Sequence, residues 1–320
     1  MKLKVAIIHK FGPGNPYEVE EKHLQALLAV EPEISFTIAR SEDELIETCP
    51  DADILICWGI FTPIRWCRGA KSLKWIQSVS AGVDALMPIK AEFPNLIITK
   101  GSGIHGIPMA EYVVLYMLMI AKRIPFIMAN QPKAEWKKPK DPIPFEIEGK
   151  TVGIVGMGEI GSIVAKKCKA MGLTVYGYKR TAAQYDCLDK LYLDGQLNDM
   201  LASCDFVVSL LPDTAATRNF FNAERFSAMR DGAYFISLGR GKAVDEDALL
   251  AALDGGHVAG AAMDVFQVEP LPSDSPIWQH PGIIVTPHIT GMTPYYFDRA
   301  FASTADNLKK YLAGKLKDEM

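Results

Sequence analysis

A glycine-rich turn in the middle of the chain most limits the folds that this sequence can adopt. The apolar run Val152–Val155 is followed directly by the residues Gly-Met-Gly-Glu-Ile-Gly at 156–161, which form a G-x-G-x-x-G pattern. Val164 and Cys168 continue at helical spacing. The six-residue pattern alone often arises by chance, but a strand, a tight turn and a helix in this order indicate a dinucleotide-binding α/β fold.

Each glycine of this turn has a physical task in such a fold. The first allows the tight turn, the second lets the backbone approach a pyrophosphate, and the third lets the helix pack closely on the sheet. The helix N-terminus then offers free N–H groups to the phosphates. We therefore predict that the turn binds a cofactor through Gly156, Gly158, Glu159, Ile160 and Gly161.

The end of the next predicted strand indicates which dinucleotide is preferred. An acidic residue about 20 residues beyond the glycines binds the ribose hydroxyls of NAD. Here Tyr178 is followed by Lys179, Arg180 and Thr181, with no acid. Two cations and a hydroxyl attract a 2′-phosphate, so we predict NADP(H) in preference to NAD(H). The alternative is that both cations are solvated and either cofactor is accepted.

Short apolar strands alternate with helical patterns along the whole chain, which is typical of parallel α/β architecture. The first series comprises Val5–Ile8, Ile34–Ile38, Ile54–Trp58, Trp75–Val79 and Leu96–Thr99. The second comprises Val152–Val155, Val175–Tyr178, Phe206–Leu210, Tyr234–Ser237, Val258–Met263 and Ile283–Thr286.

We therefore predict two doubly wound parallel-sheet domains. Residues 101–289 form a dinucleotide-binding Rossmann domain, which includes a helix around 109–123 and a Pro- and Lys-rich segment at 131–144. Residues 1–100 and 290–320 form a smaller, flavodoxin-like substrate-binding domain, to which a C-terminal helix between 294 and 316 returns.

Composition narrows the classes of partner. With 320 residues, 49% hydrophobic residues and a net charge of −4, the chain shows neither disorder nor a nucleic-acid-binding charge pattern. The N-terminal apolar run is too short for a signal peptide, and the most apolar later stretch, 112–121, is shorter than the ~20 residues that span a bilayer. Six scattered cysteines show no metal-ligand spacing, so we expect reduced cysteines, no metal and a cytoplasmic protein without membrane partners.

Three residues of the last third are candidates for catalysis: Arg240 between two glycines, Glu269 before a proline and His288 after one. A guanidinium matches the two oxygens of a carboxylate, and an imidazole beside a carboxylate stays protonated near neutral pH. Together they suit the reduction of a 2-keto acid to a 2-hydroxy acid. Taken singly, such an Arg is usually solvated and a lone His is usually structural.

Further motifs surround these residues in a fixed order. They are Ser80-Ala81-Gly82-Val83-Asp84, Met109-Ala110-Glu111-Tyr112, the turn 156–161, Leu211-Pro212-Asp213-Thr214 with Thr217, Ser237-Leu238-Gly239-Arg240-Gly241, Met263-Asp264-Val265-Phe266, Glu269-Pro270-Leu271 and Thr286-Pro287-His288. Through these motifs the chain resembles the D-isomer-specific 2-hydroxy acid dehydrogenase family over nearly its full length, and most of all its NADP-dependent glyoxylate/hydroxypyruvate reductases.

The resemblance implies a role for each matching residue. Arg240 would hold the substrate carboxylate with the backbone amides of Ala81, Gly82 and Val83, and His288 would donate a proton to the carbonyl oxygen while Glu269 orients its ring. Asp264 would bind the nicotinamide carboxamide. The remaining predicted site residues are Leu211, Pro212 and Thr217 for the cofactor and Trp58 for the substrate. The helix around 109–123 and the segment after it resemble the family's subunit arm, which implies a homodimer.

The sequence leaves three functions open. The first is reduction of a small 2-keto acid, with glyoxylate and hydroxypyruvate as leading substrates. The second is dehydrogenation of a bulkier 2-hydroxy acid, in which Trp58 and Met292 shape the pocket. The third is a dinucleotide-sensing protein-interaction module like the family's corepressors, which retain the same three residues.

Overall fold

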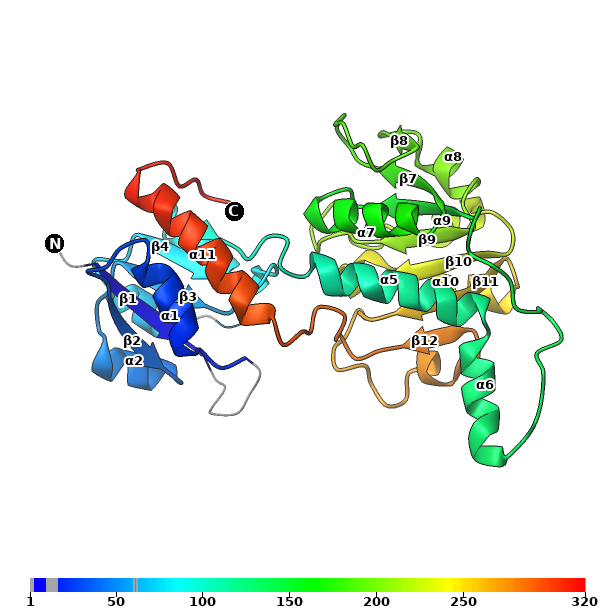
Figure 1. Cartoon of the computed structure of the whole chain (residues 1–320), viewed down its shortest axis with the longest axis horizontal. Coiled ribbons are helices and arrows are strands. Elements are labelled where there is room, and N and C mark those ends of the chain that lie inside the picture. The colour runs from blue at the N-terminus through cyan, green and yellow to red at the C-terminus, as the bar shows by residue number, and fades with distance from the viewer. Residues whose placement is uncertain (1–2, 10–16, 60, 62, 320) are drawn as a thin grey trace. The chain divides into compact units, whose positions relative to one another are not determined.

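The computed structural model describes residues 3–9, 17–59, 61 and 63–319. The chain divides into two compact units (Figure 1). Unit 1 comprises Met1–His105 and Met292–Met320, and unit 2 comprises Gly106–Gly291. These divisions lie close to the expected boundaries after residue 100 and after residue 289.

Unit 1 contains a parallel sheet of five strands in the order β2-β1-β3-β4-β5. This order is that of a flavodoxin-like sheet, as predicted. The strands are β1 (Lys4–Ile8), β2 (Ser35–Ala39), β3 (Ile54–Cys57), β4 (Trp75–Ser78) and β5 (Ile97–Thr99).

Helices cover both faces of this sheet because alternate strand residues point to opposite sides. Helices α1 (Glu21–Leu28) and α11 (Tyr296–Leu312) pack on one face, where Ile7 and Trp75 are buried. The other face is covered by α2 (Glu42–Thr48), α3 (Ile64–Gly69) and α4 (Met87–Glu92). The C-terminal helix therefore belongs to unit 1, within the range predicted for it.

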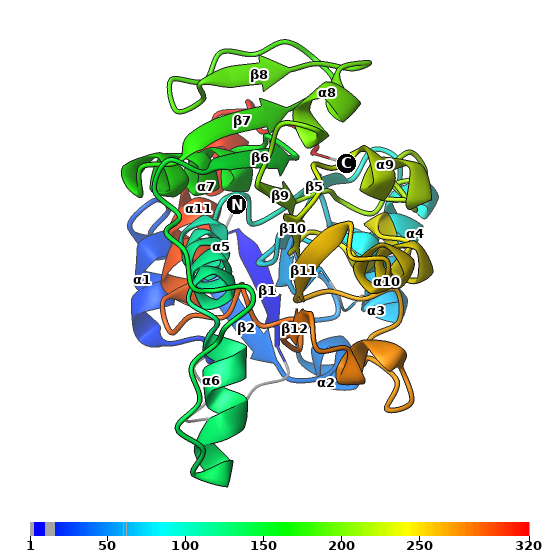
Figure 2. The same ribbon diagram turned by 90° about the vertical axis from the view of Figure 1, so that its right-hand side faces the viewer.

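Unit 2 contains a parallel sheet of seven strands in the order β12-β11-β10-β9-β6-β7-β8 (Figure 2). Starting from β6, this is the Rossmann order with one additional strand at the edge. The strands are β6 (Thr151–Val155), β7 (Thr174–Tyr178), β8 (Lys190–Tyr192), β9 (Phe206–Ser209), β10 (Ala233–Ser237), β11 (Val258–Met263) and β12 (Ile283–Val285).

The strand β8 was not predicted, since the sequence indicated six strands here. It has three residues, of which Lys190 is exposed and only Tyr192 is buried. An edge strand contacts the sheet on one side only, so it needs no continuous apolar run to form. The central strands β9 and β10, in contrast, are buried along their whole length and read clearly as apolar runs.

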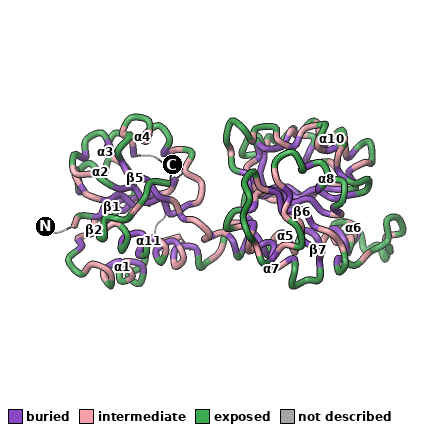
Figure 3. Tube along the Cα trace, turned by 90° about the horizontal axis from the view of Figure 1, so that it is seen from above, coloured by how far each residue is buried: buried purple, intermediate pink, exposed green. Residues whose placement is uncertain are grey.

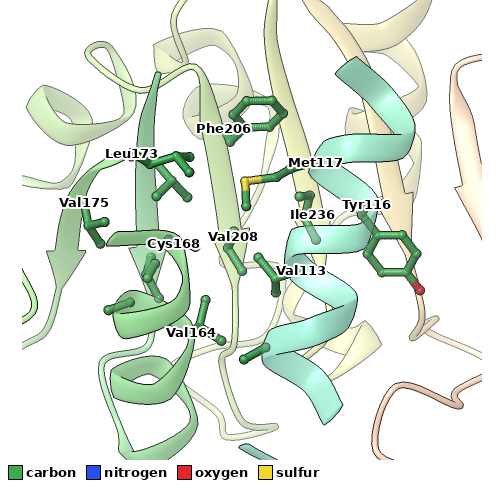
Figure 4. Close-up of a cluster of buried hydrophobic side chains, with 14 of the residues drawn as sticks. Val113, Tyr116, Met117, Val164, Cys168, Leu173, Val175, Phe206, Val208 and Ile236 are labelled. Carbon is green, nitrogen blue, oxygen red and sulfur yellow. The ribbon is translucent and has the colours of Figure 1, made fainter. Parts of the chain in front are cut away.

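Two helical layers enclose the second sheet. Helices α5 (Gly106–Ala121) and α7 (Glu159–Ala170) pack against each other and against one face, where Val113, Val164 and Phe206 belong to one cluster of buried side chains (Figure 4). The opposite face carries α8 (Leu197–Leu201), α9 (Ala223–Ala228) and α10 (Glu246–Asp254). The strands between these layers are the most buried part of the unit (Figure 3). All six cysteines are buried and free, as expected.

A segment that we call the arm, residues 124–144, leaves the body of unit 2 (Figure 1). The predicted helix around 109–123 ends as α5 at Ala121, and Arg123 takes a left-handed conformation with a φ of 58° before α6 (Ile124–Asn130) begins. The arm exposes 96% of Trp136 and 67% of Ile143. Among the described residues no single helix is long and apolar enough to cross a membrane, although α5 taken together with Ile124–Lys133, at a 66° bend, meets the length and composition criteria.

Candidate active site

The glycine-rich turn has the geometry that its sequence predicts. Gly156 follows β6 with a φ of +110°, a conformation that side chains rarely allow, and a Cβ at Gly161 would lie 2.5 Å from the carbonyl oxygen of Gly156. Helix α7 begins at Glu159, with Gly158 as its N-cap. A Cβ at Gly158 would meet nothing within 4 Å, so the space beside this residue is open.

The start of α7 fits a dinucleotide pyrophosphate. The first intrahelical donor is the N–H of Ser162, which bonds the carbonyl of Gly158 at 3.0 Å. Within the described residues, the N–H groups of Glu159, Ile160 and Gly161 have no recorded acceptor. Free N–H groups at the positive end of a helix, next to an open glycine, are suited to bind phosphate oxygens.

A short hydrogen-bond chain links the end of β7 to this turn. The Nζ atom of Lys179 donates to the hydroxyl of Tyr185 at 2.9 Å, and that hydroxyl donates to the carbonyl of Met157 at 2.6 Å. Lys179 is partly buried, while Arg180 and Thr181 are exposed. Tyr185 was not predicted from the sequence, because a tyrosine in a loop carries no signal of its own.

The loop after β9 carries the other predicted cofactor residues. Leu211 is buried. The hydroxyl of Thr217 donates to the carbonyl of Pro212 at 2.5 Å and accepts from the N–H of Thr214 at 2.9 Å. In this structure Thr217 therefore fixes the shape of the loop.

The three candidate catalytic residues all lie in unit 2, at or beyond the carboxyl ends of β10, β11 and β12. These strands are neighbours in the sheet, which explains why residues far apart in sequence meet. The Nδ1 atom of His288 lies 2.6 Å from Oε2 of Glu269, whose Oε1 accepts from the N–H of Phe266 at 2.9 Å. Because a carboxylate can only accept, Nδ1 carries a hydrogen and Nε2 is left for another partner.

The charges of Arg240, Glu269 and His288 shift the pKa values of the carboxyl group and of the imidazole. The hydrogen bond to Glu269 raises the pKa of His288, against the opposing effects of burial and of the Arg240 charge. Burial opposes ionisation of Glu269, but the hydrogen bonds from His288 and Phe266, with the positive charges nearby, lower its pKa overall. The pair therefore favours a protonated imidazole next to an ionised carboxylate. The imidazole remains accessible, with 50% of its side chain exposed.

Asp264 makes hydrogen bonds within the chain. It is fully buried, and its two oxygens accept four hydrogen bonds from Thr286, Ile289 and Thr290, on either side of His288. The contact with a nicotinamide carboxamide stays a prediction. What the structure shows is an anchor for the backbone that carries His288. Of the residues that provide its donors, only Thr286 belongs to a motif quoted from the sequence.

The remaining predicted substrate residues lie in unit 1. Trp58 follows β3 and stacks on Tyr296, with ring centroids 5.1 Å apart. Ala81, Gly82 and Val83 lie between β4 and a short 3₁₀ helix at Asp84–Leu86. In the described part of the chain their three N–H groups have no recorded acceptor, so they are able to bind an anion.

Comparisons with known proteins show which family the chain is similar to. Residues 114–290 match the model of the D-isomer specific 2-hydroxyacid dehydrogenase NAD binding domain. A curated glyoxylate/hydroxypyruvate reductase A of Photorhabdus laumondii is 31% identical over 272 residues, which cover 83% of this chain and 84% of that protein.

Solved structures agree along nearly the whole length. A D-isomer specific 2-hydroxyacid dehydrogenase of Xanthobacter autotrophicus, in complex with NADPH and MES, superposes with a TM-score of 0.84 at 29% identity, covering 99% of this chain and 97% of that one. An NADPH-dependent glyoxylate/hydroxypyruvate reductase of Sinorhizobium meliloti, in complex with NADP and sulfate, gives 0.81 at 29% identity with the same coverage. The chain therefore belongs to the D-isomer specific 2-hydroxyacid dehydrogenase family, a family of oxidoreductases.

Proposed function

We propose that this protein transfers a hydride between NADP(H) and a small 2-keto acid, and that it reduces glyoxylate or hydroxypyruvate. The observation that carries the proposal is the His288–Glu269 pair, with the charge of Arg240 acting on both. The activities named for the relatives from Photorhabdus laumondii and Sinorhizobium meliloti support the choice of substrate.

Each residue of the candidate site then has a separate role in the proposed reaction. The cofactor supplies the hydride. Arg240 binds the substrate carboxylate, because its planar guanidinium matches the two oxygens of that group. His288 donates the proton of Nε2 to the carbonyl oxygen, while Glu269 holds the Nδ1 hydrogen and favours the charged imidazole.

The cations after β7 support NADP(H) as the cofactor. We expect the double change Lys179→Ala and Arg180→Ala to raise the KM for NADPH by about tenfold or more, because charge-assisted hydrogen bonds to a phosphate are lost. The KM for NADH should change little. Initial rates with each reduced cofactor measure both values.

A matched control is Lys167→Ala, which removes a positive charge that pairs with Glu111 on the same unit. This variant should keep both KM values. A wild-type protein that used NADH as efficiently as NADPH would contradict the assignment of Lys179 and Arg180.

The pH dependence follows from the raised pKa of His288. Reduction needs the protonated imidazole, so its rate should hold through neutral pH and fall as the pH rises through that pKa. Glu269→Gln removes the charge that raises the pKa, so the alkaline decline should move to lower pH. The profile of kcat/KM against pH measures this shift.

The variant Asp247→Asn removes an exposed carboxylate of the same unit and should leave the profile in place. If Glu269→Gln gave the wild-type profile as well, Glu269 would not be the residue that tunes the histidine.

A substrate panel tests the proposed function itself. Oxidation of NADPH is followed after addition of glyoxylate, hydroxypyruvate and a series of bulkier 2-keto acids. We expect the highest kcat/KM with the two small acids. A clear preference for a branched or aromatic keto acid would show that the substrate is bulkier than proposed. Absence of turnover with every acid would favour a dinucleotide sensor.

The arm supports the proposal that the protein is a homodimer. Met128, Trp136 and Ile143 expose 60%, 96% and 67% of their surface, and such exposed apolar side chains are typical of an interface. Light scattering measures the mass in solution.

The six free and buried cysteines fit a reducing compartment, and we propose the cytoplasm as the location.

A further inference from the structure

The segment 286–290, which carries His288, is held by a single buried carboxylate. Oδ1 of Asp264 accepts from the hydroxyl of Thr286 at 2.6 Å and from the N–H of Ile289 at 2.9 Å. Oδ2 accepts from the N–H and the hydroxyl of Thr290, at 3.0 and 2.6 Å. Donors therefore converge on Asp264 from both sides of the histidine.

This anchoring is needed because His288 has an unfavourable backbone conformation. Its φ is 53°, in the left-handed region that residues other than glycine rarely adopt. Its own N–H bonds the backbone carbonyl of Asp264 at 2.9 Å and lies 3.1 Å from that of Thr286. The direction in which the imidazole leaves the chain thus depends on hydrogen bonds that hold this backbone in place.

Tyr116 of helix α5 extends the network. Its hydroxyl lies 2.6 Å from Oγ1 of Thr286. The Thr286 hydroxyl has one hydrogen, which it donates to Asp264, so Tyr116 must be the donor in the remaining contact. Burial raises the pKa of Tyr116, so the phenol keeps the hydrogen that this contact requires.

The position of Tyr116 suits this task. Its ring is 1% exposed and belongs to the core between α5 and the sheet. In Figure 4 its hydroxyl points away from the aliphatic cluster that contains Val164 and Cys168. The ring is therefore fixed by packing, and its one polar atom is directed to the strand end that leads to the histidine.

We infer that Tyr116 is a positioning residue for His288, which acts through Thr286 and Asp264 to fix the geometry of the proton donor. The inference rests on the proposed function, in which His288 donates the proton. Tyr116 itself touches neither the substrate nor the cofactor.

The first test is Tyr116→Phe, which removes one oxygen and keeps the ring in the core. We expect kcat to fall by about threefold to tenfold, in line with the loss of one hydrogen bond, while the KM for the keto acid and for NADPH stays within about twofold. The solvent isotope effect on kcat should rise, because proton transfer from a less well placed imidazole becomes slower. The matched control is Tyr234→Phe, another buried tyrosine of the same core, which should keep the wild-type kcat and isotope effect.

The second test asks whether Tyr116 acts through Thr286. Thr286→Val should lower kcat by about tenfold or more, because the donor to Asp264 is lost as well, and Thr286→Ser should restore most of the activity. Adding Tyr116→Phe to Thr286→Val should cause no further loss, since both changes act through one oxygen atom. A full additional loss in the double variant would overturn the proposed connection.

The third test does not depend on activity. Hydrogen–deuterium exchange of the wild type and of Tyr116→Phe is compared for peptides that cover 286–290, in which the N–H groups of His288, Ile289 and Thr290 bond Asp264. We expect exchange about threefold to tenfold faster there in the variant and unchanged in α7. Unchanged exchange at 286–290, or a kcat and isotope effect equal to those of Tyr234→Phe, would overturn the inference. A wild type inactive with every keto acid would instead refute the proposed function, and the exchange would still decide whether Tyr116 positions the segment.

Discussion

Replacement of His288 by alanine is expected to lower kcat for keto acid reduction by about 10² to 10⁴-fold, the range that a positioned general acid contributes. The imidazole is the proton donor of the proposed reaction. Nδ1 lies 2.6 Å from Oε2 of Glu269 and donates its hydrogen there, so Nε2 is the nitrogen that remains to donate a proton. The affinity for NADPH should stay near that of the wild type, because His288 does not contribute to the phosphate-binding turn. Steady-state rates and a fluorescence titration with NADPH measure the two quantities separately.

The matched control for this change is His257→Ala. His257 also contacts a carboxylate, with Nδ1 3.3 Å from Oδ1 of Asp231, but it precedes β11 and therefore lies at the amino end of the strands. Its replacement should leave kcat within about twofold. If His288→Ala kept a near-normal kcat, His288 would not be the proton donor and the proposed mechanism would be wrong.

Replacement of Arg240 by alanine is expected to raise the KM for the keto acid by about 10²-fold, since removal of one partner of a hydrogen-bonded charge pair costs several kcal/mol. Arg240→Lys should recover only part of this loss, because an ammonium group does not offer the two parallel donors that match a carboxylate. The dependence of the initial rate on keto acid concentration, at saturating NADPH, measures the change.

The control variant is Arg230→Ala, which removes an exposed guanidinium that pairs with Asp205 at 3.0 Å. Its KM should remain within about twofold of the wild-type value, because exposed ion pairs contribute little. An Arg240→Ala enzyme with normal kcat/KM would show that another group of the chain binds the substrate carboxylate.

The order of both sheets could be anticipated from the sequence because their central strands are buried on both faces. Such strands must be continuous apolar runs, and the turn at 156–161 identifies the strand from which the second sheet is numbered. The edge strand β8 was not predicted, since with Tyr192 as its single buried residue it has no apolar run. The end of the linking helix was also misplaced, because nothing in the sequence around Arg123 indicates a left-handed residue there.

In the candidate site, too, only the residues that belong to a recognisable sequence pattern could be predicted. Arg240, Glu269 and His288 could be named as candidates because their residue types and local motifs carry chemistry. The hydrogen bonds of Asp264 could not be predicted, because the number of donors that reach a buried carboxylate depends on how Thr286 and Thr290 are packed. The hydrogen bonds of Tyr116 and Tyr185 could not be predicted for the same reason, because each tyrosine meets its partner only in the folded chain.

The position of His288 beyond β12 has a consequence for the stability of the site. This strand has three partly exposed residues and forms the outer edge of the sheet, where it pairs with β11 alone. Strands of this kind open locally at a lower cost in free energy than central strands do. His288 is thus attached to one of the least protected parts of its unit, and activity should disappear on warming or in mild denaturant before the bulk of the helical signal is lost.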